Sequence, residues 1–348
     1  MRQAILIAAL CALASCGGEI PTERYQTTRD NIVDVSEKLV KIDLGEDLLL
    51  GQGSVTIVGE YLLIGDYTSK KELLHILDRT SFDHIWSGLR KGRGRGEVQA
   101  LGKISADEER RCFFAIGRGN AVAYNVDSLM NMRDYTPANY GSIRISDDSF
   151  DGTRSVGSIE YVNDTLSFAL LISIPKDGRV SVSNGMLKIK GGSLQTTAFN
   201  TTKGGVNIVG RSYPDDVEPF FCGTGSLRHN LIAEGHQSKD LLSLHDLEGN
   251  LICNVFGPDW ESLDEKIGFK SIHIIDDQIF ATYSGRNVDE PKMEPECITI
   301  FDINGEYLKT LDFGVGIFSY TYDKKRDRLI LFVESEENPI VYIDMKNL

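Results

Sequence analysis

Four arginines and one histidine are the residues of this chain best suited to bind an anion together. They are Arg93, Arg95, Arg118, His236 and Arg286, and each lies in or next to a loop that follows a run of strand-forming residues. Grouped guanidinium groups bind carboxylates and phosphates through paired, charge-assisted hydrogen bonds. If the fold brings these loops to one face, the sequence predicts a small anionic ligand or a protein partner there.

The alternative is that these side chains are solvated loop charges without a ligand. Acidic residues that could neutralise them are present in the same segments, namely Glu97, Glu234 and Asp289. Both interpretations stay open at the level of the sequence.

No motif predicts a catalytic nucleophile, a metal or a cofactor. The chain lacks Gly-x-Ser-x-Gly and His-Glu-x-x-His, and its six histidines include no pair at short helical spacing. Residues 92–96 (Gly-Arg-Gly-Arg-Gly) precede neither a Lys-Ser/Thr pair nor a helical pattern, so a nucleotide loop is not expected. Residues 147–152 partly resemble a calcium loop, but Ser158 occupies the twelfth position, where glutamate is needed. A site assembled from several repeats would carry no such motif.

The cysteines match no zinc-binding spacing. Besides Cys11 and Cys16 near the N-terminus, the chain has Cys112, Cys222, Cys253 and Cys297, each in or beside an apolar run. Four cysteines allow three pairings in an oxidising compartment, and buried free thiols are the favoured interpretation.

The loops named above connect short apolar runs that recur along the chain. Each repeat contains a turn signal, a uniformly apolar run and a second run that ends in Asp or Asn. These runs are rich in β-branched and aromatic residues, which is typical of strands. Units of roughly 40–60 residues with four strands each are typical of propeller blades. The second runs end at Asp78, Asp127, Asn184, Asp246, Asp302 and Asp344.

We therefore predict an all-β fold, a six-bladed β-propeller with four antiparallel strands per blade. The last unit stops after its third strand, whereas residues 38–45 have the pattern of an outer strand that the first unit does not need. We expect residues 38–45 to complete the last blade, which closes the ring and removes an exposed sheet edge.

The N-terminus predicts export and lipidation. Arg2 is followed by an apolar stretch at residues 4–14, and Leu-Ala-Ser-Cys at residues 13–16 resembles the bacterial lipobox. We assign residues 1–15 to a lipoprotein signal peptide, residues 16–36 to a polar tether lipidated on Cys16, and residues 37–348 to the propeller. Gly17 after the cysteine favours the outer membrane. The alternative is a cleaved, soluble signal peptide with an incidental cysteine.

The segment Gly-Arg-Gly-Arg-Gly-Glu at residues 92–97 resembles the blade connections of NHL-type six-bladed propellers. The whole of residues 38–348, together with the lipobox, resembles the TolB-like six-bladed propeller lipoproteins of Gram-negative bacteria. The resemblance implies an exported, lipid-anchored propeller. It implies little about chemistry, because most members of that group have no assigned activity.

The formal net charge of −14 argues against binding to nucleic acid or to anionic lipid surfaces. We predict a non-enzymatic binding or scaffold propeller that contacts the membrane only through the lipid on Cys16. Two alternatives stay open. One is a metal-dependent hydrolase or lactonase with its site in the central channel, and the other is an accessory lipoprotein that binds a glycan or another solute.

Overall fold

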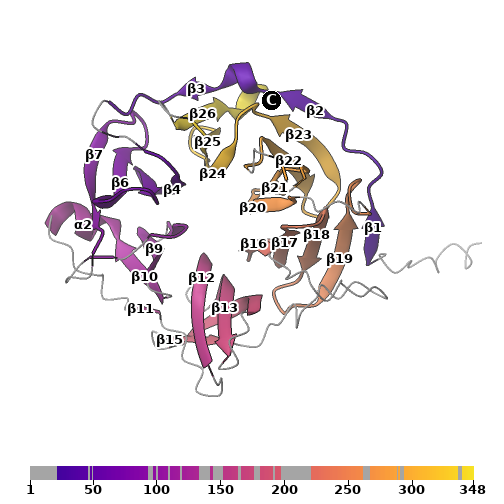
Figure 1. The fold of residues 1–348 in the computed structure, drawn as a ribbon, viewed down its shortest axis with the longest axis horizontal. Coiled ribbons are helices and arrows are strands. Elements are labelled where there is room, and N and C mark those ends of the chain that lie inside the picture. The colour runs from indigo at the N-terminus through magenta and orange to yellow at the C-terminus, as the bar shows by residue number, and fades with distance from the viewer. Residues whose placement is uncertain are drawn as a thin grey trace, which may run out of the picture.

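The structure is a computed structural model of the full chain. It describes the following residues: 22–45, 48, 50–92, 97–98, 101–108, 110–117, 120–132, 142–143, 152–163, 166–175, 181–190, 193–196, 221–261, 267–287, 289–290, 294–335 and 339–348. The described strands form six sheets that are arranged around a common centre (Figure 1). We number these sheets by their order along the chain.

The first three sheets have four strands each. The first contains β4 (Gly53–Val58), β5 (Tyr61–Asp66), β6 (Glu72–Asp78) and β7 (His84–Arg90). The second contains β8 (Ser105–Asp107), β9 (Cys112–Gly117), β10 (Asn120–Asn125) and β11 (Ser142–Ile143). The third contains β12 (Gly152–Asn163), β13 (Leu166–Pro175), β14 (Ser181–Lys190) and β15 (Ser193–Thr196).

The last three sheets each include a strand from the N-terminal part of the chain. The fourth contains β16 (Phe221–Ser226), β17 (Leu231–His236), β18 (Leu241–His245), β19 (Leu251–Phe256) and β1 (Glu23–Tyr25). The fifth contains β20 (Phe269–Ile275), β21 (Gln278–Tyr283), β22 (Cys297–Asp302), β23 (Tyr307–Asp312) and β2 (Ile32–Asp34). The sixth contains β24 (Ile317–Asp323), β25 (Arg328–Val333), β26 (Ile340–Asp344) and β3 (Val40–Lys41).

The repeat expected from the sequence is visible in the strand register. The pairing of the third with the fourth strand shifts by one residue at Ile76/Leu77, at Leu244/His245 and at Ile300/Phe301. Five of the described hairpins between first and second strands place one residue at positive φ, at Gly59, Arg111, Asn230, Asp276 and Asp327. Such recurring irregularities indicate that each sheet is one copy of the same structural unit.

The cores lie between neighbouring sheets. Leu63 and Ile76 of the first sheet pack with Phe113 of the second, and Leu244 of the fourth packs with Ile272 of the fifth. The first and sixth sheets also share a core, although they lie at opposite ends of the chain. It contains Ile57, Leu62, Ile330, Phe332 and Ile340, with Ile42 from the N-terminal part. Among the described side chains, the first, second, fourth, fifth and sixth sheets therefore each bury a face against a neighbouring sheet, as strands with apolar residues on both faces require.

Residues 38–45 differ partly from the expected strand. Only Val40 and Lys41 form β3, which pairs antiparallel with β26, and the backbone N–H of Ile42 donates to the carbonyl of Ile340 at 3.0 Å. Ser36–Lys38 form a 3-10 helix (η1) instead of extending the strand, and a second 3-10 helix (η2) spans Met345–Asn347.

The tether predicted for residues 16–36 also differs from the structure in its described part. From Thr22 onward the segment lies along the rim, where β1 pairs parallel with β19 and β2 pairs parallel with β23 (Figure 1). Its polar composition suggested a free linker, but backbone groups of an added outer strand can pair with a sheet edge whatever the side chains are.

The one α-helix among the described residues, α2 (Val126–Met132), was not expected. Its seven residues are too few to show a helical period in the sequence. Asn125 accepts a hydrogen bond from the N–H of Ser128 at 2.9 Å, while Val126 and Leu129 are buried. No helix within the described ranges is long and apolar enough to cross a membrane.

Candidate functional site

The structure describes two of the five residues that the sequence predicted for an anion site. Arg93, Arg95 and Arg118 lie outside the described residues. Arg286 forms an ion pair with Glu296, a partner that the sequence analysis did not name. His236, at the end of β17, has no exposed surface. The anion site on the loop face therefore stays a prediction, and it depends on Arg93, Arg95 and Arg118, which lie outside the described residues.

His236 has the environment of a neutral imidazole. Its Nδ1 accepts a hydrogen bond from the backbone N–H of Ser238 at 3.1 Å, which requires that nitrogen to be unprotonated. Burial, together with the charge of Lys239, lowers the pKa of His236 to about 3. A neutral, enclosed ring offers no positive charge to an anion.

Acidification from about pH 7.5 to about pH 5 is expected to lower the free energy of unfolding by about 2 kcal/mol through His236 alone. The folded pKa of about 3 lies below the value of 6.5 for a free histidine. Between these values the unfolded chain binds a proton that the folded chain does not, so stability falls as the pH falls. Urea unfolding at a series of pH values measures the effect.

The matched variants for this experiment are His236→Gln and His84→Gln, the second at an exposed histidine. His236→Gln should reduce the slope of stability against pH below pH 6.5 by about 1.4 kcal/mol per unit. An unchanged slope in His236→Gln would contradict the neutral ring.

A cavity lies between the inner strands of four sheets, and we call it the channel cavity. Its volume is about 650 Å³. Inner strands β4, β8, β20 and β24 and the turns that follow them form its wall. The residues that line it include Thr56, His273, Asp276, Tyr320, Lys324 and Lys325. Its size and position are those of a small-molecule site.

The wall of the channel cavity combines aromatic and polar groups. The rings of His273 and Tyr320 meet edge to face with centroids 4.7 Å apart. The hydroxyl of Tyr320 donates to the carbonyl of Phe280 at 2.7 Å, which holds the ring in place. Burial lowers the pKa of His273 well below its usual range. The wall therefore presents a neutral imidazole and a fixed phenol ring.

Two lysines lie at the mouth of the channel cavity. Lys324 forms an ion pair with Asp276 in the neighbouring hairpin, and Lys325 forms one with Glu60 of the first sheet. The two lysine side chains are 71% and 57% exposed, respectively. Ion pairs that water reaches this easily are worth about 0–1 kcal/mol. An incoming anion can therefore replace the carboxylate partners at little cost.

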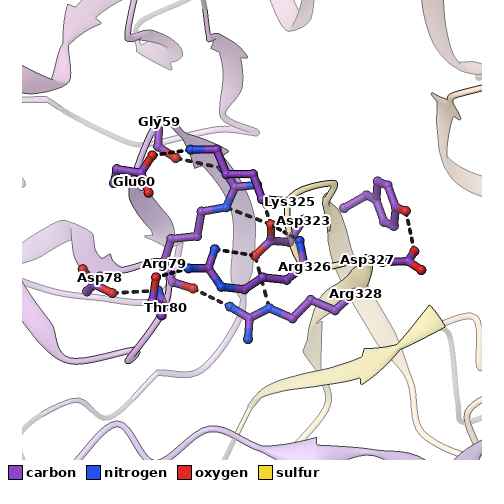
Figure 2. A network of polar contacts seen from close by, with 11 residues as sticks. Gly59, Glu60, Asp78, Arg79, Thr80, Asp323, Lys325, Arg326, Asp327 and Arg328 are labelled. Carbon is purple, nitrogen blue, oxygen red and sulfur yellow. Dashed lines mark hydrogen bonds and ion pairs between the residues drawn. The ribbon is translucent and has the colours of Figure 1, made fainter. Parts of the chain in front are cut away.

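A buried cluster of arginines supports the turn that carries these lysines (Figure 2). Asp323 is fully buried, and its Oδ1 accepts hydrogen bonds from Nε and Nη2 of Arg79 at 3.0 and 2.5 Å. Its Oδ2 accepts from Nε of Arg328 at 3.2 Å and lies 3.5 Å from Nη1 of Arg326. Burial by itself would raise the pKa of Asp323, but the hydrogen bonds and charges of Arg79 and Arg328 hold it below its usual value.

The cluster joins the first sheet to the sixth. Arg79 follows β6, and its Nη1 donates to the carbonyl of Gly59 at 2.9 Å, whereas Asp323 ends β24. The guanidinium of Arg328 lies over the rings of Phe82 and Tyr342, at 4.5 and 5.1 Å from their centroids. These contacts fix the turn that carries Lys324 and Lys325 against the first sheet.

The mouth lies at the opposite end of the strands from the predicted loop face. Asp276 precedes β21, whereas Arg286 follows it. An antiparallel strand of six residues spans roughly 20 Å, so these residues belong to different faces of the ring. The basic turn at residues 323–328 was not predicted as a site, because its pattern is that of an ordinary turn between two strands, although four of its side chains are cationic.

Possible metal ligands and cysteine thiols are both present within the described ranges. There, no group of three or more His, Cys, Asp or Glu side chains is arranged to hold a metal ion. Cys112, Cys222, Cys253 and Cys297 are free. Burial raises the pKa of Cys222 and of Cys297 to about 12, so both thiols are neutral.

Neither a protein-family model nor a curated protein matches the chain. Several solved structures are similar. A member of the DUF4221 family from Bacteroides vulgatus is 11% identical with a TM-score of 0.50, and the match covers 89% of this chain and 96% of that one. The calcium-binding protein regucalcin from Agrobacterium tumefaciens is 7% identical with a TM-score of 0.50, covering 93% and 95%.

A third similar structure is a protein of unknown function from Bacteroides thetaiotaomicron, 10% identical with a TM-score of 0.50, covering 92% of this chain and 73% of that one. At such identities the likeness shows the fold alone. The prediction of an all-β β-propeller is confirmed. The resemblance to TolB-like and NHL-type lipoproteins in particular stays a prediction.

Proposed function

We propose that this chain is an exported, lipid-anchored six-bladed propeller that binds a small anionic ligand without transforming it. In this proposal the six sheets are six blades, and β3 supplies the outer strand that closes the ring. The pairing of β3 with β26 and the core shared by the first and sixth sheets support closure. The signal-like residues 1–15 and the lipobox at Cys16 support export to a membrane, with the outer membrane favoured by Gly17.

The observation that carries the binding function is the pair Lys324 and Lys325 at the mouth of the channel cavity. Both ammonium groups are exposed and held by weak pairs, above a cavity of about 650 Å³. Lysine binds phosphate and carboxylate as a point charge. A ligand with a carboxylate or phosphate at the mouth and a compact polar body in the cavity fits this arrangement.

Binding of inorganic phosphate and of citrate to the purified chain, measured by isothermal titration calorimetry, tests the proposal. The double variant Lys324→Ala/Lys325→Ala should raise the dissociation constant of whichever anion binds by about tenfold or more, because two charge-assisted contacts are lost. The matched control is Lys70→Ala/Lys71→Ala, another pair of adjacent exposed lysines. It should leave the affinity unchanged.

A third variant, Arg93→Ala/Arg95→Ala, shows whether the anion binds at the loop face or at the channel cavity. If the anion site lies at the channel cavity, this variant binds like the original chain. If it weakens binding while the Lys324/Lys325 variant does not, the ligand binds the loop face predicted from the sequence and the channel site is wrong. Equal binding by all variants would contradict both sites.

A further inference from the structure

Residues 22–35, which we call the strap, follow the rim of the fourth and fifth sheets. The strap pairs with the outer edge of each sheet over three residues, Glu23–Tyr25 with β19 and Ile32–Asp34 with β23. Much of it faces solvent, with Tyr25 52% and Ile32 60% exposed. Val35 at the end of the strap is buried in the core, and Arg29 turns its charged side chain inward between the two sheets.

Arg29 fills a pocket that matches a guanidinium group. Its Nη1 lies 2.6 Å from Oδ1 of Asp240, and the two side chains are 8% and 1% exposed. The guanidinium carbon lies 5.1 Å from the ring centroid of Phe301, 5.7 Å from that of Tyr283 and 6.0 Å from that of Phe269. Aromatic faces and a carboxylate are the groups that bind arginine in preference to lysine.

The rest of the pocket holds the carboxylate of Asp240 in place. The backbone N–H of Asp259 donates to its Oδ2 at 3.3 Å, and the hydroxyl of Tyr283 donates to Asp259 at 3.1 Å. A Cβ on Gly257 would lie 2.0 Å from the same oxygen, so a residue without a side chain is needed there. These contacts are made by residues in and beside the fourth and fifth sheets, and none of them involves a side chain of the strap.

The strap supplies only part of what a buried guanidinium requires. Nε of Arg29 donates to Oε1 of Gln26 at 2.9 Å, within the strap itself. Its Nη2 is buried and has no hydrogen-bond partner among the described residues. A buried donor without a partner is unfavourable, because it has lost its hydrogen bonds to water. The pocket therefore holds its occupant through the carboxylate and the rings, but leaves one donor unsatisfied.

We infer that this pocket is an arginine-recognition site whose resident ligand is the strap, and that it accepts the same extended segment when that segment is supplied by another molecule of this chain. Recognition combines two elements. The outer edges of β19 and β23 pair with an extended backbone, and the pocket between the sheets binds the side chain of one arginine. Both elements are formed by the fourth and fifth sheets, which therefore act as a peptide-binding surface.

A fluorescent peptide of residues 22–35, titrated into the full-length chain by anisotropy, tests the inference. The variant Arg29→Ala empties the pocket and should bind the peptide at least tenfold more tightly than the original chain does. In the original chain the tethered strap competes at a high effective concentration. A peptide with Arg29→Lys should bind at least tenfold more weakly, because an ammonium cannot lie flat against the rings.

Two further variants make the result unambiguous. Asp240→Asn in the Arg29→Ala chain should weaken binding of the arginine peptide at least tenfold, because the charged partner of the guanidinium is lost. Arg24→Ala, also in the strap but at an exposed pair with Glu306, should behave like the original chain. If Arg29→Ala does not fold, the full-length Arg29→Lys chain replaces it and should give the same ranking of peptides. Equal affinity for the arginine and lysine peptides, or no binding to either chain variant, overturns the inference.

Discussion

Replacing Asp323 with alanine is expected to lower the free energy of unfolding by about 3–5 kcal/mol. Asp323 is the carboxylate between Arg79 and Arg328, whose residues are only 3% and 6% exposed (Figure 2). Its removal leaves two buried guanidinium groups without a counter-ion, and desolvated charges without a partner are strongly destabilising. Urea unfolding followed by circular dichroism measures the change.

The control for this experiment is Glu306→Ala, which removes the carboxylate of an exposed arginine pair. The side chain of Glu306 is 65% exposed, so its loss should cost less than about 1 kcal/mol. If Asp323→Ala costs no more than the control does, the cluster is solvated in solution and does not hold the first and sixth sheets together.

Replacing Ile42 with alanine is expected to cost about 2–5 kcal/mol. Ile42 is 3% exposed and directly follows β3. It packs in the core that contains Leu62 and Ile64 of the first sheet together with Phe332 and Ile340 of the sixth. The substitution creates a cavity at the junction where the two ends of the chain meet, so it tests the proposed closure of the ring.

Val40→Ala is the matched control within the same strand. Val40 pairs with Tyr342 in the sheet, but its side chain is 43% exposed, so the change should stay within about 0.5 kcal/mol. Trp86 in the first sheet and Trp260 beside the fourth report unfolding by fluorescence. A loss in Ile42→Ala as small as that in Val40→Ala would show that residues 38–45 do not contribute to closure.

Local sequence patterns were sufficient to predict the strands and most turns. Asp302, which was predicted as the end of a second run, ends β22, and β22 pairs antiparallel with β21. These features depend on neighbours within a few residues, because alternation and turn residues act locally. Of residues 38–45, which were expected to form a strand of the last unit, only Val40 and Lys41 pair with β26.

The candidate site was predicted less well, and particular residues show why. His236 was expected to face a ligand because it ends a strand, but it is enclosed and neutral. Arg286 was expected to be neutralised by Asp289 if it bound no ligand, yet its partner is Glu296. Whether a charged side chain at a strand end faces solvent, a ligand or a carboxylate depends on the neighbouring loops, which no local pattern describes.

By itself the sequence determined that this chain is built from repeated strand units, that its surface is acidic and that an N-terminal segment belongs with the last unit. Only the tertiary structure decided which charges meet. Arg79 and Asp323 are 244 residues apart in the chain, and Arg29 and Asp240 are 211 residues apart. Strand formation depends on side chains close in sequence, whereas the partner of a buried charge depends on which sheets become neighbours when the propeller assembles.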